Sequence, residues 1–85
     1  MDEMEKNIRD LYEKILKPQG IELDSITDGS TGEANPQNFK VEISQRTMVT
    51  FRKGENVVYE TFYSSDPVKI EEALKQVQLE FALKP

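Results

Sequence analysis

The feature that most constrains the fold is a run of residues, 39–52, in which two classes of side chain alternate with period two. One parity is mostly apolar (Phe39, Val41, Ile43, Val49 and Phe51), and the other is mostly charged (Lys40, Glu42, Arg46 and Arg52). This alternation is typical of antiparallel strands with one buried face and one wet face. A single strand of this length would be unusual. The polar residues Gln45–Thr47 therefore predict a hairpin bend, whose three-residue loop would set Ile43 opposite Val49 and Val41 opposite Phe51.

A second turn and a further strand follow this run. The turn is predicted at Lys53–Asn56, whose glycine and asparagine tolerate positive φ. The strand, Val57–Ser64, is apolar on both parities, with Glu60 among the second set. Because an unpaired carboxylate in a core is costly, we expect the parity without Glu60 to face the helices: Val57, Tyr59 and Tyr63. The open face of the sheet would then hold Met48, Val58 and Phe62.

Helices are predicted on both sides of the strands. In Asp2–Lys17 the apolar residues recur with helical spacing: Met4, Ile8, Leu11, Tyr12 and Ile15. Pro18 and Gly20 are expected to end that helix. A second helix is predicted over Pro67–Leu83, because Asp66 can cap its first turn and proline suits its first position. Its main apolar stripe is Ile70, Ala73, Leu74, Val77 and Phe81, and a second apolar side holds Val68, Leu79 and Leu83.

The segment that links the first helix to the strands is polar and acidic. Residues 21–26 could form either a short strand or an extended loop. Thr27–Asn38 is rich in Gly, Ser, Thr, Asn and Pro, so we expect a mobile acidic loop within 18–38. The sequence thus predicts one α+β domain over 1–85, in the order α-(β)-β-β-β-α. Its antiparallel sheet would have three to four strands, with both helices packed on one face.

This order of elements resembles that of the double-stranded-RNA-binding domain, and the resemblance is one of topology only. That family contacts RNA through basic residues at the start of its second helix, among other contacts. Here the corresponding stretch reads Asp66-Pro67-Val68-Lys69-Ile70-Glu71-Glu72, which has the opposite charge. RNA binding is therefore not carried over to this chain.

Several chemistries are excluded or disfavoured by composition. The chain has no Cys and no His, which removes disulfides, thiol nucleophiles and histidine-based triads. An EF-hand loop that began at Asp24 would have Ile26 and Asn35 at two ligand positions, so calcium binding is not expected. Gly29 and Gly32 lack the Lys-Ser/Thr of a phosphate loop. We predict a protein that is not an enzyme and has no cofactor or metal.

The net charge of -5 comes from 11 basic and 16 acidic residues, and it argues against a general nucleic-acid binder. The acidic residues expected at the surface are Glu22, Asp24, Asp28, Glu33, Glu55 and Glu60. Basic residues gather in the predicted hairpin as a stripe: Lys40, Arg46, Arg52 and Lys53. No leader and no run long enough to span a bilayer is visible in the sequence, which predicts a cytoplasmic protein without a membrane partner.

A protein-interaction domain is the leading functional hypothesis, and an inhibitor or modulator of a partner protein would fit it. The predicted interface, which could also join two copies as a homodimer, comprises Met48, Val58, Phe62, Leu79 and Leu83. One alternative is an acidic mimic that blocks a basic DNA- or RNA-binding protein, of the phage or mobile-element type. A less favoured alternative is a weak nucleic-acid-binding module that uses the basic hairpin 40–53.

Overall fold

The chain starts with a helix, continues through an antiparallel sheet and ends with a second helix. A computed structural model describes residues 3–35 and 40–84, with the side chains of 30–45 excepted. The elements in chain order are α1 (Glu3–Ile15), a short 3-10 helix η1 (Lys17–Gln19), β1 (Glu22–Asn35), β2 (Lys40–Lys53), β3 (Asn56–Phe62) and α2 (Pro67–Leu83). The predicted α+β class is confirmed, and the predicted bounds of the second helix match α2.

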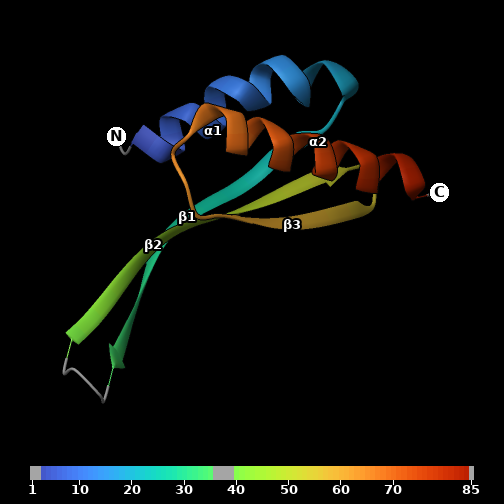
Figure 1. Cartoon of the computed structure of the whole chain (residues 1–85). Helices are drawn as coiled ribbons and strands as arrows, with labels where there is room; N and C mark the ends of the chain where they lie inside the picture. The colour runs from blue at the N-terminus through green and yellow to red at the C-terminus, as the bar shows by residue number, and fades with distance from the viewer. Residues whose placement is uncertain (1–2, 36–39, 85) are drawn as a thin grey trace.

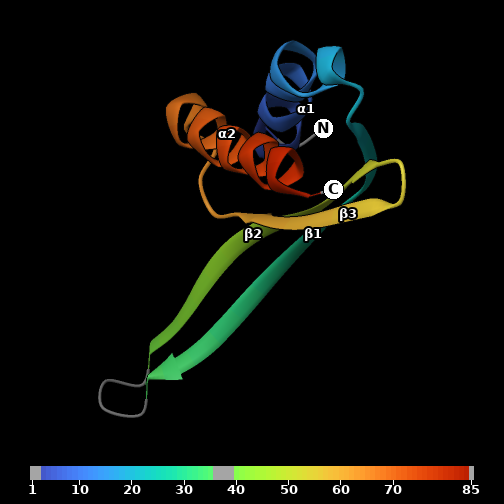
Figure 2. The ribbon, with the colours of Figure 1, turned by 90° about the vertical axis from the view of Figure 1, so that its right-hand side faces the viewer.

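The described strands form one antiparallel sheet in the order β1-β2-β3, so β2 is central. Both helices lie over the same face of this sheet (Figures 1 and 2), as predicted. The turn between β2 and β3 is tight, with Gly54 at a φ of 62°. α2 begins where the sequence indicates, because an Asp66 carboxylate oxygen accepts a hydrogen bond from the Val68 N–H at 3.0 Å.

The predicted bend at Gln45–Thr47 is wrong, because β2 is one continuous strand of 14 residues. That stretch holds no Gly, Pro or Asn to favour a turn. The buried hydroxyl of Thr47 also has a partner on the neighbouring strand, because Thr47 Oγ1 donates a hydrogen bond to Asp28 Oδ1 at 3.0 Å. The residues predicted to pair across the bend pair with β1 instead: Val41 with Ala34, Ile43 with Gly32, Val49 with Ile26 and Phe51 with Leu23.

The loop predicted over Thr27–Asn38 also needs correction. Residues 27–35 continue β1, and 36–38 lie outside the described residues. For residues 21–26 the sequence allowed either a strand or a loop. Residues 22–26 belong to β1, and the register of β1 with β2 shifts between Leu23 and Ser25. The polar composition of this segment suggested a loop, but β2 pairs with it and supplies hydrogen-bond partners for its backbone.

β1 and β2 extend well past the end of β3. β3 ends at Phe62, opposite Thr47, and beyond that point the ladder consists of β1 and β2 alone. We call residues 29–35 and 40–46 the arm. It projects away from the helices (Figures 1 and 2). The molecule measures 48 × 25 × 19 Å with a radius of gyration of 14.8 Å, whereas a compact chain of this length would have about 12 Å.

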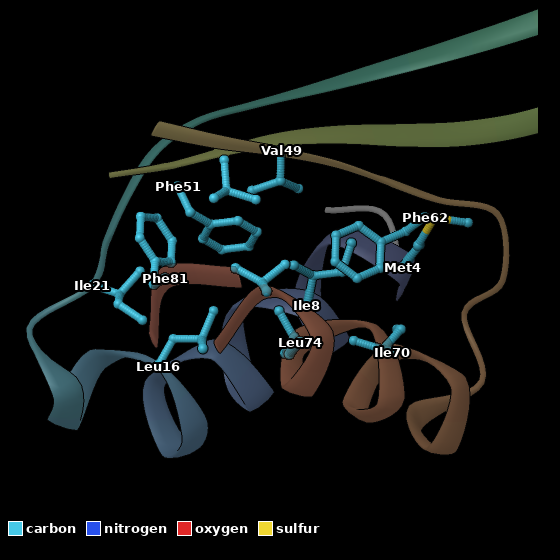
Figure 3. Packing of buried hydrophobic residues seen from close by; sticks show 12 residues of the cluster. Met4, Ile8, Leu16, Ile21, Val49, Phe51, Phe62, Ile70, Leu74 and Phe81 are labelled. Atoms are coloured by element: carbon cyan, nitrogen blue, oxygen red, sulfur yellow. The ribbon is translucent and has the colours of Figure 1, made fainter. Parts of the chain in front are cut away.

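The core lies between the helices and the body of the sheet, as Figure 3 shows. Its buried members are Met4, Ile8, Leu16, Ile21, Val49, Phe51, Val58, Phe62, Ile70, Leu74, Val77 and Phe81. The apolar faces predicted for the two helices are confirmed, with Leu11, Tyr12, Ile15 and Ala73 at the edge of the core. Leu16, which the helical pattern did not include, is fully buried just past the end of α1.

Tyr12 joins α1 to the start of β1. Its hydroxyl donates a hydrogen bond to the Ile21 carbonyl at 2.7 Å and accepts one from the Leu23 N–H at 3.1 Å. Its ring stacks on Phe51 of the central strand, with the ring centroids 6.1 Å apart. One side chain therefore fixes the position of the helix relative to two strands.

The orientation of β3 is opposite to the prediction. Val58 and Phe62 are 4% and 3% exposed in the core, while Tyr59 and Tyr63 are 77% and 70% exposed. Glu60, between the two buried residues, is only partly buried. The prediction assumed that a carboxylate on the helix-facing side would be enclosed. β3 is an edge strand, so this carboxylate reaches the rim of the core, and the expected cost of burial is small.

Candidate functional site

The most distinctive surface of the molecule lies where the free edge of β3 runs beside α2. Within the described residues, β3 pairs with β2 alone, so its other edge carries no strand. Alternate residues of such an edge present their N–H and C=O groups outward, which makes it a template for a further strand. α2 runs alongside β3 (Figure 1) and covers the helix-facing side of this edge.

Two surface depressions follow this edge, and we call them together the β3–α2 groove. The first, of about 430 Å³, is lined by Val57, Val58, Tyr59, Glu80, Leu83 and Lys84. The second, of about 320 Å³, is lined by Thr61, Phe62, Tyr63, Ser64, Lys69, Ile70 and Ala73. Apolar groups predominate in both linings, so each depression can accept an apolar side chain.

Glu60 stands on β3 between the residues that line the two depressions. Partial burial raises the pKa of its carboxyl above the usual value, and the nearby carboxylate of Glu80 on α2 raises this pKa further. The backbone N–H of Thr61 donates a hydrogen bond to Glu60 and partly offsets both effects on the pKa. The carboxylates of Glu60 and Glu80 therefore lie near each other beside the first depression, which Lys84 also lines.

The hydrogen bond from Thr61 also shows which backbone groups of β3 face outward. In an antiparallel strand, successive residues direct their backbone groups alternately to the two sides. An N–H that reaches a carboxylate at the rim belongs to the outward set. That set is Val57, Tyr59 and Thr61, while Val58, Glu60 and Phe62 direct their backbone groups toward β2. Glu60 thus covers one outward N–H, a way in which natural edge strands limit unwanted pairing.

Three of the predicted interface residues, Val58, Phe62 and Leu83, line the β3–α2 groove, whereas Met48 and Leu79 line neither of its depressions. Val58 and Phe62 belong to the core, which corrects their assignment to the open face of the sheet. Met48 remains on that open face and is 39% exposed. Leu79 and Leu83 on α2 are 52% and 77% exposed, and of these two only Leu83 lines the groove.

The acidic residues are spread over different parts of the fold. Asp24 pairs with Arg52 at 3.2 Å, and Asp28 accepts the hydrogen bond from Thr47. Glu22 is exposed at the start of β1, and Glu55 is exposed in the turn before β3. Of the predicted acidic residues, only Glu60 lies beside the groove, on β3 between the residues that line its two depressions. The side chain of Glu33 lies outside the part that the structure describes.

The predicted basic stripe follows β2. The side chain of Arg46 lies over Gly29 of β1, and a Cβ added at Gly29 would be 3.7 Å from the Arg46 Nε. This Nε is buried and has no hydrogen-bond partner among the described residues. Arg52 is held by Asp24, and Lys53 is exposed at the end of the strand. The side chain of Lys40 is not among those described. The residues therefore share a strand, but Arg46 is at the base of the arm and Arg52 is in the body.

Sequence reasoning missed the groove because it placed the wrong face of β3 against the helices. Glu80 and Lys84 were not named, and Tyr59 was expected to face the helices, although all three line the first depression. One available signal was the pair of tyrosines at 59 and 63, because tyrosine tolerates exposure better than valine or phenylalanine does.

No group of three or more acidic, His or Cys side chains is placed to hold a metal ion in the described part of the chain. Within the same residues, neither helix combines the length and the apolar character that crossing a bilayer requires. Comparisons with protein-family models, with curated proteins and with solved structures found no match to this chain.

Proposed function

We propose that this chain is a protein-interaction domain that binds an extended segment of a partner protein as an added strand on the free edge of β3. The observation that carries the proposal is the outward edge at Val57, Tyr59 and Thr61, which runs directly beside two mostly apolar depressions. In this recognition mode, backbone hydrogen bonds supply affinity and side-chain pockets supply specificity.

Such a domain needs no chemistry of its own. It acts as an inhibitor or modulator by holding a segment that its partner requires elsewhere. β3 has seven residues, which is enough to pair with a short extended segment. The exposed ring of Tyr59, on the open face of the sheet, can pack against the opposite side of the same segment.

Weak nucleic-acid binding through the arm is a second candidate, favoured by the way in which the two-stranded arm projects from the body (Figure 2). A two-stranded ribbon can enter the major groove of DNA. The segment 29–46 carries Lys40 and Arg46 against Glu33 and Glu42, so its formal charges cancel. Phosphate binding through counterion release is therefore weak. Binding to labelled DNA and RNA at low salt, with a steep loss at higher salt, would favour this candidate over ours.

Selection from a random peptide library tests the proposed function. The protein is immobilised, and the selected peptides are titrated against wild type, Leu83→Glu and Tyr59→Pro. Proline is compatible with residue 59 because the N–H there faces away from β2. Leu79→Glu is the matched control, since Leu79 is exposed on the same helix and lines neither depression.

We expect the selected peptides to bind wild type and Leu79→Glu alike, and to lose at least about tenfold in affinity for the other two variants. Circular dichroism verifies that each variant is folded. A library that yields no binder would overturn the proposal. So would selected peptides whose affinity is unchanged by both Leu83→Glu and Tyr59→Pro.

A further inference from the structure

Glu60 lies on β3 between the residues that line the two mostly apolar depressions of the β3–α2 groove. The carboxylate of Glu80 on α2, which lines the first depression, is near enough to raise the pKa of Glu60. On either side of Glu60 along the strand, Val58 lines the first depression and Phe62 lines the second. The order along the edge is therefore apolar, acidic, apolar, at every second residue.

An added strand would meet these three features with alternate side chains. Residues two apart in a strand point to the same face, about 6.6 Å from one another. A segment paired with β3 thus sets three side chains of one parity beside Val58, Glu60 and Phe62. The outer two enter the depressions that contain Leu83 and Ile70, and the middle one meets the two carboxylates.

We infer that the partner segment has the pattern apolar-x-basic-x-apolar, with a lysine or arginine seated between Glu60 and Glu80; this inference rests on the proposed function. The basic side chain supplies a countercharge for Glu60, which forms no ion pair within the part of the chain that the structure describes. The pattern reads the same in both directions, so it suits parallel as well as antiparallel addition.

Two lysines also line the depressions. Lys84 lines the first together with Glu80 and Leu83, and Lys69 lines the second together with Ile70. Both are exposed residues of α2. Neighbouring basic residues in the partner would meet these lysines and be disfavoured. A single central basic residue with apolar neighbours therefore fits better than a run of basic residues does.

A second copy of this chain is a poorer occupant. β3 holds no basic residue, so a second copy paired along this edge would place no countercharge from its own strand beside Glu60. Each copy also carries a net charge of -5, which adds a general repulsion. The charge of the groove thus selects a basic partner segment over self-pairing.

Synthetic peptides test the inference directly. We would titrate the capped peptides Thr-Val-Thr-Lys-Thr-Val-Thr and Thr-Val-Thr-Glu-Thr-Val-Thr, each labelled for fluorescence anisotropy, against the full chain. We expect the lysine peptide to bind at least about tenfold more tightly than the glutamate peptide. In Glu60→Lys the preference should reverse. Glu72→Lys makes the same change of charge at an exposed position of α2 outside the groove, and it should keep the wild-type preference.

The possible outcomes separate the two proposals. If both peptides bind equally and Leu83→Glu still abolishes binding, the inference fails and the proposed function stands. If neither peptide binds, the inference also fails, and the library selection decides the proposed function. If sedimentation equilibrium shows a wild-type dimer that Tyr59→Pro dissociates, the occupant is a second copy and the inference is overturned.

Discussion

The substitution Tyr12→Phe tests how the fold holds α1 against the sheet. It removes a single oxygen atom and leaves in place the ring that stacks on Phe51. The lost hydroxyl bridges the Ile21 carbonyl and the Leu23 N–H, at 2.7 and 3.1 Å. Both backbone groups belong to the segment that leads from η1 into β1, so the substitution weakens the junction without emptying the core.

The expected cost follows from the two hydrogen bonds. Each contributes a net of about 1 kcal/mol to the free energy of unfolding. Because the site is only partly buried, water can replace part of this, so we expect a loss of about 1–2 kcal/mol. For a chain of this length the total stability is roughly 4–13 kcal/mol. The melting temperature should fall by about 4–16 °C.

Urea unfolding followed by circular dichroism measures this cost. The urea midpoint should fall while the slope stays unchanged, because the area exposed on unfolding is nearly the same. Tyr59→Phe is the matched control, since Tyr59 is 77% exposed, and its free energy of unfolding should change by less than about 0.5 kcal/mol. A Tyr12→Phe variant as stable as this control would refute the idea that the hydroxyl joins α1 to β1.

Three further substitutions test other parts of the structure. Because the fold raises the pKa of Glu60 above its ordinary 4.5, the folded state holds that proton more tightly than the unfolded state does. Wild type should therefore lose stability relative to Glu60→Gln as the pH rises from 4 to 7. A difference in urea midpoint between the two proteins that is the same at pH 4 and at pH 7 would contradict this. Asp66→Ala removes the cap on the Val68 N–H and should cost about 1 kcal/mol in urea unfolding. Gly20→Ala places a side chain at a φ of 79° and should also cost about 1 kcal/mol, with no loss refuting the left-handed geometry.

The helices could be predicted from the sequence because their signals are local. α2 begins at Pro67 after the Asp66 cap and ends at Leu83, as the pattern indicated. In α1 the apolar positions were recognised from their spacing. Leu16 was missed because it follows the last helical residue, and its burial depends on how η1 folds back.

The sheet could be predicted only in part, because pairing is decided by residues far apart in the sequence. Residues 27–35 have the composition of a loop and become a strand only because β2 offers them a partner. Thr47 interrupted the apolar parity of β2, and nothing near it in the sequence pointed to Asp28 as its hydrogen-bond acceptor.

The candidate site was missed for a related reason. The cost of burying Glu60 was judged as though β3 lay inside the sheet, where a carboxylate could not reach water. At an edge, the same residue can face the helices and remain at the rim. Whether a strand is central or at an edge depends on the order of strands, which alternation does not encode.

The most direct test of strand addition at β3 is amide hydrogen exchange measured by NMR, with and without the lysine peptide. In the free protein, the amides of Val58, Glu60 and Phe62 should exchange slowly, and those of Val57 and Tyr59 should exchange fast. With peptide bound, Val57 and Tyr59 should gain protection, because their outward N–H groups now pair with the added strand. Bound peptide that leaves these two amides unprotected would contradict strand addition at this edge.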